Sequence, residues 1–446
     1  MGMRRIVAAL LAVTASAVAV AAFGAGAGAA ATNGGPAYSG KLVFWFWAES
    51  DAPGANAWMA GRIKAYEKLH PKVTIELVPQ ATSTLQGAFE TAAQSKSGPD
   101  LATQWSTLPT LTPAWEGQTV PVSDYVPKSD MKYWLNTSEN LYKGKVWAAP
   151  LYLLGIPFVW NKTLFHKAHL NPNSPPKTFP QLLSDCAALK KAGITPFIMG
   201  DNEQSVGSWF MSTIALGDFK SVKQVLQLSL GSGSGNATWV SQLAQLYSHK
   251  CFNNDIANLP AQQGFNEFAQ GKGAMELATD GQVAAAEKVL PKGSIGVAKY
   301  PVAGNGKLGS YYDVTQSSNE MITSWSQHKK EAAMFLVWLH TPANQRSWYK
   351  ATGVFPADSR FPASAVKDPL AKQLLKLDTG PKQFWLENFL PPQVDSNGVR
   401  PATQALLSGG SSASATSDAI ARSIKQWQEQ QPQQLQQMKS WATTLK

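Results

Sequence analysis

Aromatic and hydrogen-bonding side chains recur where the predicted strands of this sequence end. Apolar runs at 42–47 and 194–199 predict strands that are buried on both faces. The segments that end or follow the predicted strands carry Trp47, Glu49, Trp105, Tyr152, Asp201, Asn202, Asp280 and Gln282. Because loops at the carboxyl ends of strands converge in open parallel sheets, we expect these side chains to form one binding site.

The chemistry of these residue types suits a ligand that has one apolar face and an edge of hydroxyl groups. An indole ring packs on the apolar face, while carboxylate and amide groups bond the hydroxyls. The chain contains 16 Trp, and each has core packing as its alternative role. We expect core packing for Trp45 and Trp160, which lie inside predicted strands. Trp47 and Trp105 lie at strand ends and fit either role.

Helix capping is the alternative role for Asp201 and Asp280, because an aspartate side chain often accepts bonds from the first turn of a helix. Burial of a ligand hydroxyl without a partner is unfavourable, so carboxylates at these positions would set selectivity. We expect Asp201 and Asp280 to face the same hollow as Trp105, and the binding-site hypothesis fails if all three point away from any shared hollow.

Signals for catalysis or for a bound cofactor are weak. His166 and His169 have an i, i+3 spacing, but a third ligand is missing nearby, so a solvated helix face is expected. Residues 304–309 fit the pattern Gly-x-Gly-x-x-Gly, yet Ser-Tyr-Tyr-Asp follows them instead of a helix, and we interpret the segment as a hairpin turn. A serine nucleophile elbow is absent from the sequence. We therefore predict no catalytic residue, no metal and no cofactor.

The elements that position these residues begin with a strand, a helix and a strand. The run 42–47 predicts the first strand, residues 58–69 have apolar side chains at helical spacing, and 73–78 predicts the second strand. Strand, helix and strand of these lengths form a βαβ unit and imply a parallel sheet.

The stretch 148–193 predicts a crossing between two α/β lobes. An apolar, β-rich run ends at Asn161, and Pro175 and Pro176 enforce an extended loop. Thr178 and Gln181 have the spacing of a capping box, which opens a helix that ends at Gly193.

Length and composition favour a globular protein of two or three domains. The chain has 446 residues, of which 44% are hydrophobic and 15% charged, so a large core can form. The formal net charge is +10, which could indicate an anionic partner. The basic residues do not form the compact stripe that nucleic-acid binding requires, and we predict no nucleic-acid partner.

Residues 1–31 have the pattern of a cleaved signal peptide. Arg4 and Arg5 precede an apolar stretch at 6–23, and 29–31 is a small-residue cleavage site. A transmembrane anchor is the alternative, but the apolar stretch is at the short end for spanning. Cysteine is absent near the cut, so we predict export without a lipid anchor and a periplasmic or secreted location. The arginine pair leaves general secretion and twin-arginine export both open.

The two cysteines, Cys186 and Cys251, are a candidate disulfide. Export exposes them to an oxidising compartment. Burial as two unpaired thiols is the alternative, because Cys186 lies on the apolar face of its predicted helix.

The order of these signals resembles extracellular solute-binding proteins of the sugar-binding type, which are similar to maltose-binding protein. The run Tyr-Lys-Gly-Lys-Val-Trp-Ala-Ala-Pro at 142–150, the Trp-Asn-Lys at 160–162 and the Pro-Pro-Lys-Thr-Phe turn at 175–179 resemble family signatures. Further matches lie at 41–45, 69–71, 73–76, 98–101, 271–275 and 353–357. Where the family often has a tryptophan near residue 281, this chain has Gln282.

The resemblance implies the type II periplasmic-binding-protein fold, which has two α/β lobes of mixed sheets flanked by helices and a hinged cleft between them. After the signal peptide and a linker at 32–39, the expected N-terminal lobe is 40–154 plus 301–341, and the expected C-terminal lobe is 155–300 plus 342–446. Hinges are expected at 154–157, 300–301 and 341–342. Trp209, which begins a predicted helix after the Asp201 loop, is an expected ligand contact that also fits core packing, and the resemblance adds Tyr312, Asp313 and Trp385.

The function that this resemblance implies is capture of a carbohydrate, expected to be an oligosaccharide, in the cleft of a monomer and delivery to the permease of an ATP-driven importer. Two other functions stay open. One is an exported glycan-active enzyme that uses paired carboxylates such as Glu49 and Asp280. The other is a binding protein for a solute that is not a sugar, such as a polyol phosphate or a peptide.

Overall fold

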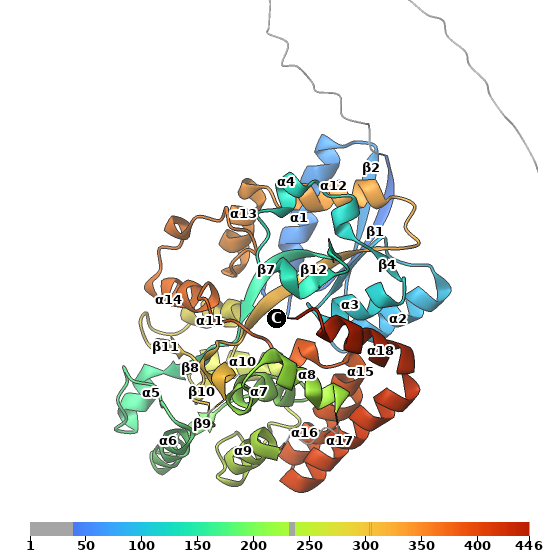
Figure 1. The fold of residues 1–446 in the computed structure, drawn as a ribbon. Helices are drawn as coiled ribbons and strands as arrows, with labels where there is room; N and C mark the ends of the chain where they lie inside the picture. Colours follow the sequence, from blue (N-terminus) through green and yellow to red (C-terminus); the bar gives the residue numbers. More distant parts are fainter. Residues whose placement is uncertain (1–38, 232–236, 303, 305, 446) are drawn as a thin grey trace, which may run out of the picture. The chain divides into compact units, whose positions relative to one another are not determined.

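The computed structural model describes residues 39–231, 237–302, 304 and 306–445. The predicted signal peptide and nearly all of the predicted linker at 32–39 lie outside these residues. Within the described part, Figure 1 shows strands gathered in two separate regions, each flanked by helices.

The first sheet has the strand order β2-β1-β3-β12-β4, and β7 also pairs with β12. Strands β1, β2 and β3 run parallel, with Gly40 beside Val73 and Phe44 beside Leu101. The long strand β12 runs antiparallel to β3, β4 and β7. The bounds are β1 Gly40–Phe46, β2 Val73–Pro79, β3 Leu101–Gln104, β4 Thr119–Val120, β7 Ala149–Gly155 and β12 Val314–Thr323. The predicted parallel βαβ start is therefore confirmed.

The second sheet has the strand order β11-β8-β10-β9 and is also mixed. Strand β10 runs parallel to β9 and antiparallel to β8, and β8 pairs antiparallel with β11. The bounds are β8 Phe158–Asn161, β9 Thr195–Phe197, β10 Gly273–Leu277 and β11 Ile295–Ala298, and a separate hairpin consists of β5 Leu141–Tyr142 and β6 Lys145–Val146. The part of the molecule built on each sheet is called the first and the second lobe below.

The chain passes from one sheet to the other between β7 and β8, as the sequence predicts. Strand β7 ends at Gly155 in the first sheet, and β8 begins at Phe158 in the second. Asn161 then caps the next helix through its side chain, and Thr178 caps the one after it by accepting from Gln181 N at 3.3 Å. The predicted Thr178 cap is therefore present, whereas Gln181 Oε1 accepts from Lys177 N at 3.0 Å instead of from Thr178 N, so the expected capping box is only half formed.

Helices cover both sheets. Helices α1, α2 and α12 contact strands of the first sheet, and α5, α6, α10 and α14 contact strands of the second. The α-helices are α1 Ala55–Leu69, α2 Leu85–Ser95, α3 Leu108–Trp115, α4 Lys128–Met131, α5 Lys162–Lys167, α6 Phe179–Lys191, α7 Val206–Ile214, α8 Val222–Leu230, α9 Ala237–Ser248, α10 Ala261–Ala269, α11 Asp280–Glu287, α12 Lys329–Leu339, α13 Pro342–Thr352, α14 Pro369–Asp378, α15 Pro392–Val394, α16 Arg400–Leu407, α17 Ala413–Gln430 and α18 Pro432–Ala442. Short 3-10 helices are η1 Val122–Asp124, η2 Thr137–Asn140, η3 Ala215–Asp218, η5 Lys307–Ser310, η6 Ala363–Ala365 and η7 Glu387–Phe389, and η8 Asp395–Val399 is a π-helix.

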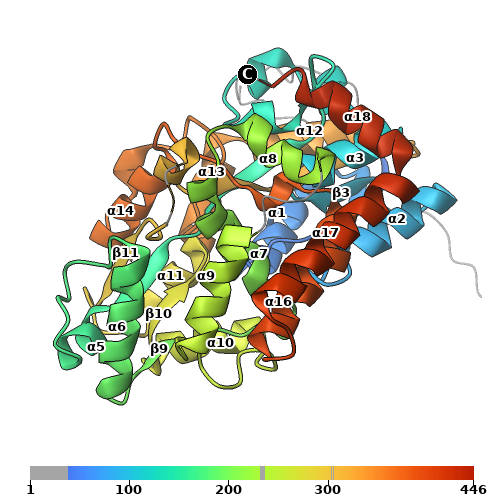
Figure 2. The ribbon, with the colours of Figure 1, turned by 60° about the horizontal axis from the view of Figure 1, so that its bottom comes forward.

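The C-terminal helices connect the two lobes. Helices α16 and α17 contact α9 of the second lobe, whereas α18 contacts α3 of the first lobe. Trp441 of α18 lies 6.2 Å from Trp115 of α3, measured between ring centroids. Figure 2 shows α17 and α18 beside α2 and α3. The predicted small-residue linker at 408–417 is partly helical, because Ser412 caps α17 by accepting from Ala415 N.

Two other segments differ in detail from the sequence interpretation. Helix α13, which the expected lobe boundaries place in the second lobe, packs on α1 of the first: Trp58 and Trp348 lie 5.0 Å apart, and Trp58 Nε1 donates to Ser347 Oγ at 2.9 Å. The segment expected to form a hairpin turn at 304–309 contains η5, whose Leu308 is buried.

Candidate functional site

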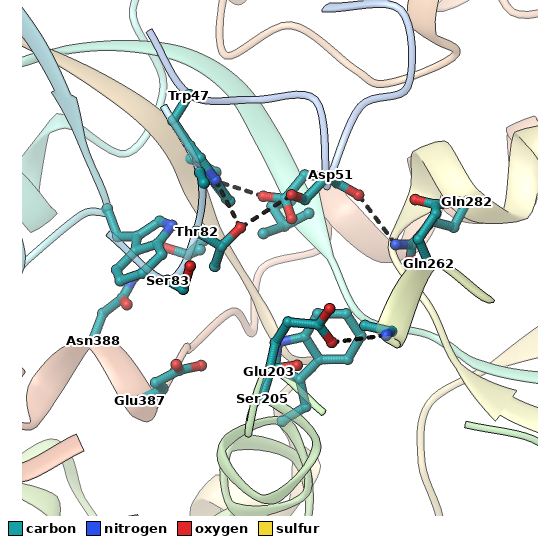
Figure 3. Close-up of a pocket in the computed structure, with 18 of the residues that line it drawn as sticks. Trp47, Asp51, Thr82, Ser83, Glu203, Ser205, Gln262, Gln282, Glu387 and Asn388 are labelled. Carbon is teal, nitrogen blue, oxygen red and sulfur yellow. Dashed lines mark hydrogen bonds between the residues drawn. The ribbon is translucent and has the colours of Figure 1, made fainter. Parts of the chain in front are cut away.

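A cavity of about 340 Å³ lies where the two lobes meet, at the ends of β1 and β3 and in front of β12. Its volume is within the range of small-molecule sites. Figure 3 shows Trp47 and Thr82 on one side of it and Glu203 and Ser205 on the other. The lining residues are Trp47, Ser50, Asp51, Ala81, Thr82, Ser83, Trp105, Leu154, Glu203, Ser205, Trp209, Ala261, Gln262, Phe265, Gln282, Thr315, Ser317, Trp385, Glu387, Asn388 and Arg400. We call it the tryptophan cavity.

Two indole rings from adjacent strands form one wall. Trp47 directly follows β1 and Trp105 directly follows β3, and their rings lie 5.5 Å apart at 90°. Trp47 Nε1 donates to Thr82 Oγ1 at 2.9 Å, so the Trp47 ring is held in its orientation by the loop after β2 (Figure 3). The edge-to-face geometry is a favourable arrangement for an aromatic pair, and both rings line the cavity.

The backbone that supports this wall is strained at Ser318 in β12. Ser318 has φ of 53°, which is unusual for a residue that is not glycine. Its Oγ atom bonds the carbonyl oxygen of Trp47 at 3.1 Å and Glu320 Oε1 at 2.7 Å. Because such strain persists only where the surroundings stabilise it, Ser318 is a positioning residue for the Trp47 segment.

Asp51 provides a buried carboxylate next to the indole wall. Its Oδ2 atom accepts hydrogen bonds from Tyr152 at 3.1 Å and from Ser317 at 3.2 Å. Burial raises the pKa of Asp51 to about 7, and these two hydrogen bonds limit the rise. The group can therefore both donate to and accept from a ligand hydroxyl near neutral pH.

Arg400, at the start of α16, forms the centre of an ion-pair network that lines the cavity next to Trp105. Its Nη2 atom donates to Glu387 Oε1 at 2.9 Å and its Nε atom donates to Asp395 Oδ2. The guanidinium group lies 5.7 Å from the centroid of the Trp105 ring. Burial and the charge of Asp395 raise the pKa of Glu387 to about 8, although Arg400 opposes that rise. Two carboxylates thus compensate the positive charge of Arg400.

The second lobe contributes an aromatic pair and a carboxylate. Trp209 of α7 stacks on Phe265 of α10, with ring centroids 6.0 Å apart at 25°. Glu203, in the loop before α7, accepts a hydrogen bond from Ala261 N at 2.8 Å and is exposed. The helix starts of α7 and α10 therefore place aromatic and polar groups at one edge of the cavity.

Gln282 links the lobes through the start of α11. It completes a capping box with Thr279, and its Nε2 atom donates to the Ser50 carbonyl oxygen at 3.1 Å. Thr279 Oγ1 donates to the Asp51 carbonyl oxygen at 2.8 Å. The loop at 50–51 is thus bound from the second lobe at two adjacent carbonyl groups.

The structure brings together part of the expected site. The expected residues that line the cavity are Trp47, Trp105, Trp209, Gln282 and Trp385. Those that lie elsewhere are Glu49, Tyr152, Asp201, Asn202, Asp280, Tyr312 and Asp313. We do not propose this second group as ligand contacts.

Three of the carboxylates that lie elsewhere bind backbone amides. Glu49 accepts from Gly54 N at 2.7 Å and from Asn56 N at 2.8 Å, next to the start of α1. Asp201 accepts from Val206 N at 2.8 Å, and Asp280 accepts from Gly155 N at 3.0 Å. Capping and backbone support therefore account for these groups, and the expectation that Asp201 and Asp280 face the same hollow as Trp105 is not met.

The remaining four also have other positions. Tyr152 is fully buried, stacks on Trp348 and reaches the cavity only through its bond to Asp51. Tyr312 and Asp313 are buried at the start of β12, where burial raises both pKa values. Asn202 is exposed, in the turn before Glu203.

Sequence reasoning missed most of the polar lining residues, among them Asp51, Thr82, Ser83, Glu203, Glu387 and Arg400. Thr82 and Ser83 follow β2, so the strand-end rule that found Trp47 would have found them as well. Glu387 and Arg400 belong to the C-terminal helices and are distant from Trp105 in the sequence. No local spacing indicates that they line the same cavity as Trp105.

Cys186 and Cys251 are both buried free thiols in the structure. They lie in contact, since the pKa of Cys186 is raised first by a hydrogen bond with Cys251 and then by burial. Among the described residues, no group of three or more His, Cys, Asp or Glu could hold a metal ion, and no helix is both long and apolar enough to cross a membrane.

Solved structures similar to this chain share its fold. A protein from a study of xylan utilization by Caldanaerobius polysaccharolyticus matches with a TM-score of 0.76 and 20% identity, over 86% of this chain and 100% of that one. A chitin oligosaccharide binding protein matches with a TM-score of 0.76 and 18% identity, over 87% and 98%. The GacH receptor of Streptomyces glaucescens matches with a TM-score of 0.69 and 18% identity, over 87% and 98%. The expected two-lobed fold is therefore confirmed.

A family model provides the remaining comparison. The model for bacterial extracellular solute-binding proteins matches residues 61–373, which include both sheets except β1. The match covers well over half of the chain. The resemblance inferred from the motif order is therefore confirmed, and the chain belongs to the family of bacterial extracellular solute-binding proteins.

Proposed function

We propose that this solute-binding protein captures a neutral oligosaccharide in the tryptophan cavity and delivers it to the permease of an ATP-driven importer. The observation that carries the proposal is the right-angled pair of Trp47 and Trp105, with polar groups of Asp51, Thr82 and Asn388 around it. Sugar rings have apolar C–H faces and hydroxyl edges, and this wall has a partner for each.

The charge of the cavity supports a neutral rather than an anionic ligand. Asp51, Glu203 and Glu387 line it, and Arg400 is the only basic residue among its described lining residues. Because Arg400 is bound to Glu387 and Asp395, its charge is compensated within the protein. A phosphate or a uronate would find no unpaired positive charge among the described lining residues, although the chain as a whole is basic. This disfavours the polyol phosphate alternative.

The comparisons also support a carbohydrate. The similar solved structures come from studies of xylan utilization, of a chitin oligosaccharide binding protein and of a receptor in complex with acarbose. The cavity volume of about 340 Å³ suits a ligand larger than one sugar ring. We propose closure of the lobes around it by bending at 154–157 and 300–301, because a ligand with higher affinity for the closed form shifts the population toward it. The expected hinge at 341–342 lies between α12 and α13, which both contact α1 of the first lobe, and it is not part of this proposal.

The cellular setting is part of the same proposal. Residues 1–31 direct export and are cleaved, the mature monomer has no lipid anchor, and it binds without turnover. The enzyme alternative named Glu49 and Asp280 as a carboxylate pair, and both groups bind backbone amides outside the cavity.

Isothermal titration of the mature protein with neutral oligosaccharides of xylose, glucose and N-acetylglucosamine tests the function. We expect micromolar or tighter binding of at least one of them, and a smaller particle in small-angle scattering when it is bound. Trp105→Ala should weaken that binding by about a hundredfold, since a stacked indole contributes several kcal/mol.

Trp45→Phe is a matched control, because Trp45 belongs to β1 but does not line the cavity. We expect it to bind the sugar as the wild-type protein does. Binding of oligogalacturonate in preference to every neutral sugar would contradict the proposal, and so would release of shorter sugars during incubation.

A further inference from the structure

A second cavity, of about 170 Å³, lies between α2 and α3 of the first lobe and the C-terminal helices. Its described lining residues differ from those of the tryptophan cavity and include seven glutamines and two glutamates. Gln104 comes from the end of β3, Glu90 from α2, Glu116 directly after α3 and Gln393 from α15. We call this cavity the amide groove.

The negative charge of the amide groove lacks a nearby counter-charge. Its described lining residues are acidic or neutral. Gln434 and Gln118 each donate to Glu116 at 2.6 Å, so each oxygen of that carboxylate accepts a hydrogen bond from a side-chain amide. Among the described residues, Glu90 accepts one hydrogen bond, which is long: Gln393 Nε2 donates to it at 3.4 Å. Partial burial and the charge of Glu116 raise the pKa of Glu90.

Unfilled acceptors face the same space. Gln104 is 2% exposed, and its Oε1 atom is buried without a hydrogen-bond partner in the described residues. Gln393 Oε1 is likewise buried and unpartnered, and its amide orientation is set because its Nε2 atom faces Glu90. An unsatisfied buried acceptor destabilises a protein by about 1–3 kcal/mol, so these atoms indicate a missing donor.

We propose that the amide groove binds the protonated primary amino group of a small molecule. An ammonium group has three N–H donors and one positive charge. Gln104 and Gln393 provide the two amide oxygens that lack a hydrogen-bond donor among the described residues. Glu90 provides a carboxylate that can accept further hydrogen bonds. Phe89 and the prolines of the groove provide apolar contacts for the carbon chain that carries the amine. A hydroxyl group matches this site less well, because it has one donor and no charge.

The site does not depend on the proposed sugar function, since it uses other residues. It does connect the lobes, because Gln104 and Glu90 belong to the first lobe whereas Gln393 belongs to the C-terminal segment. A bound ammonium group therefore stabilises the contact between α2 and α15.

Titration of the mature protein with butylammonium chloride at low ionic strength tests the proposal. We expect saturable binding with one site, and binding at least tenfold weaker for tetramethylammonium, which is a cation without N–H donors, and for butanol, which is a donor without charge. Glu90→Gln should weaken butylammonium binding by about tenfold, because it removes the negative charge and keeps the size and shape of this partly buried side chain. Gln104→Met should weaken it by a similar factor.

Glu429→Gln is the matched control, since it removes one exposed carboxylate of α17 outside the groove. We expect it to leave butylammonium binding within twofold of the wild type. The proposal is overturned if butylammonium does not saturate the wild-type protein, if tetramethylammonium binds equally well, or if the control weakens binding as much as Glu90→Gln. A protein that binds butylammonium but no sugar would overturn the proposed function alone.

Discussion

The guanidinium group of Arg400 lies over the indole ring of Trp105, 5.7 Å from its centroid, while Glu387 and Asp395 bind its edge. A cation on an aromatic face is favourable, most of all where water is excluded. Arg400 thus contacts the Trp105 ring and pairs with two acidic side chains, so we assign it a positioning role for that ring.

Replacement of this arginine should reduce both stability and affinity. Arg400→Met keeps much of the volume but leaves Glu387 and Asp395 buried without a counter-charge, so we expect a loss of about 3 kcal/mol in the free energy of unfolding. Because the Trp105 ring loses its support, sugar affinity should fall as well. Urea unfolding and calorimetric titration measure the two effects. Arg422→Met, on the surface of α17, is the control, and an equal loss in that variant would refute the role of Arg400.

A close backbone approach connects α11 to the cavity. A Cβ atom at Gly281 would lie 2.4 Å from the Asp51 carbonyl oxygen, which belongs to the rigid backbone next to the indole wall. Gly281→Ala must therefore shift either α11 or the loop at 50–51, and we expect it to destabilise the protein by about 2 kcal/mol. It should also weaken sugar binding, because Asp51 moves.

Gly61→Ala in α1 is the matched control for this variant. A Cβ atom at Gly61 meets no atom within 4 Å, and alanine is the better helix former, so stability should rise by up to about 1 kcal/mol. Thermal unfolding of both variants separates the two effects. If Gly281→Ala is as stable as the wild type, the contact between α11 and the loop is loose and the predicted coupling does not exist.

Local sequence rules predict the scaffold of this protein well. Apolar runs of strand length gave β1, β2 and the crossing from β7 to β8, and Thr178 and Gln181 gave the start of α6. Each of these features is determined within a few neighbouring residues, by backbone restriction at proline or by a capping bond. The order of such motifs was enough to identify the family.

Local rules predicted part of the site, and the family resemblance added Trp385. Trp47 and Trp105 were found because each ends a strand, whereas Asp201 and Asp280 obey the same rule but bind backbone amides. A carboxylate after a strand can bind a ligand or cap a helix, and sequence alone does not decide between them. Arg400 is nearly 300 residues from Trp105, and only the packing of the C-terminal helices brings it there.

Buried carboxyl groups should make the stability of this protein fall as pH rises. Burial raises the pKa of Glu320 from 4.5 to about 8, and the hydrogen bonds from Thr103 and Ser318 oppose that rise. The folded state therefore binds a proton between these pH values that the unfolded state has released. This contribution to the free energy of unfolding is complete below about pH 4.5 and is lost as pH increases to about 8. Asp51, whose pKa is raised to about 7, acts in the same direction.

Melting temperatures measured from pH 4.5 to 8.5 test this sign. We expect a decline across the range, and we expect the decline to be smaller in Glu320→Gln, which stays neutral and keeps an acceptor for Thr103. Glu76→Gln is the control, because Glu76 is half-exposed and paired with Lys41. A melting temperature that rises between pH 5 and 8 would show that Glu320 is ionised in the folded protein.

The contact between Cys186 and Cys251 predicts a disulfide in the exported protein. Both thiols are buried and adjacent, and loss of two protons and two electrons to the oxidising system of the compartment would join them. The bond closes a loop of about 65 residues and should add about 4 kcal/mol to the free energy of unfolding in the chain-entropy description. Alkylation of the exported protein under denaturing conditions, followed by mass spectrometry, should label neither cysteine before reduction and both after it. Cytoplasmic expression without the leader provides the comparison, and full labelling of the exported form before reduction would show that the two thiols stay free.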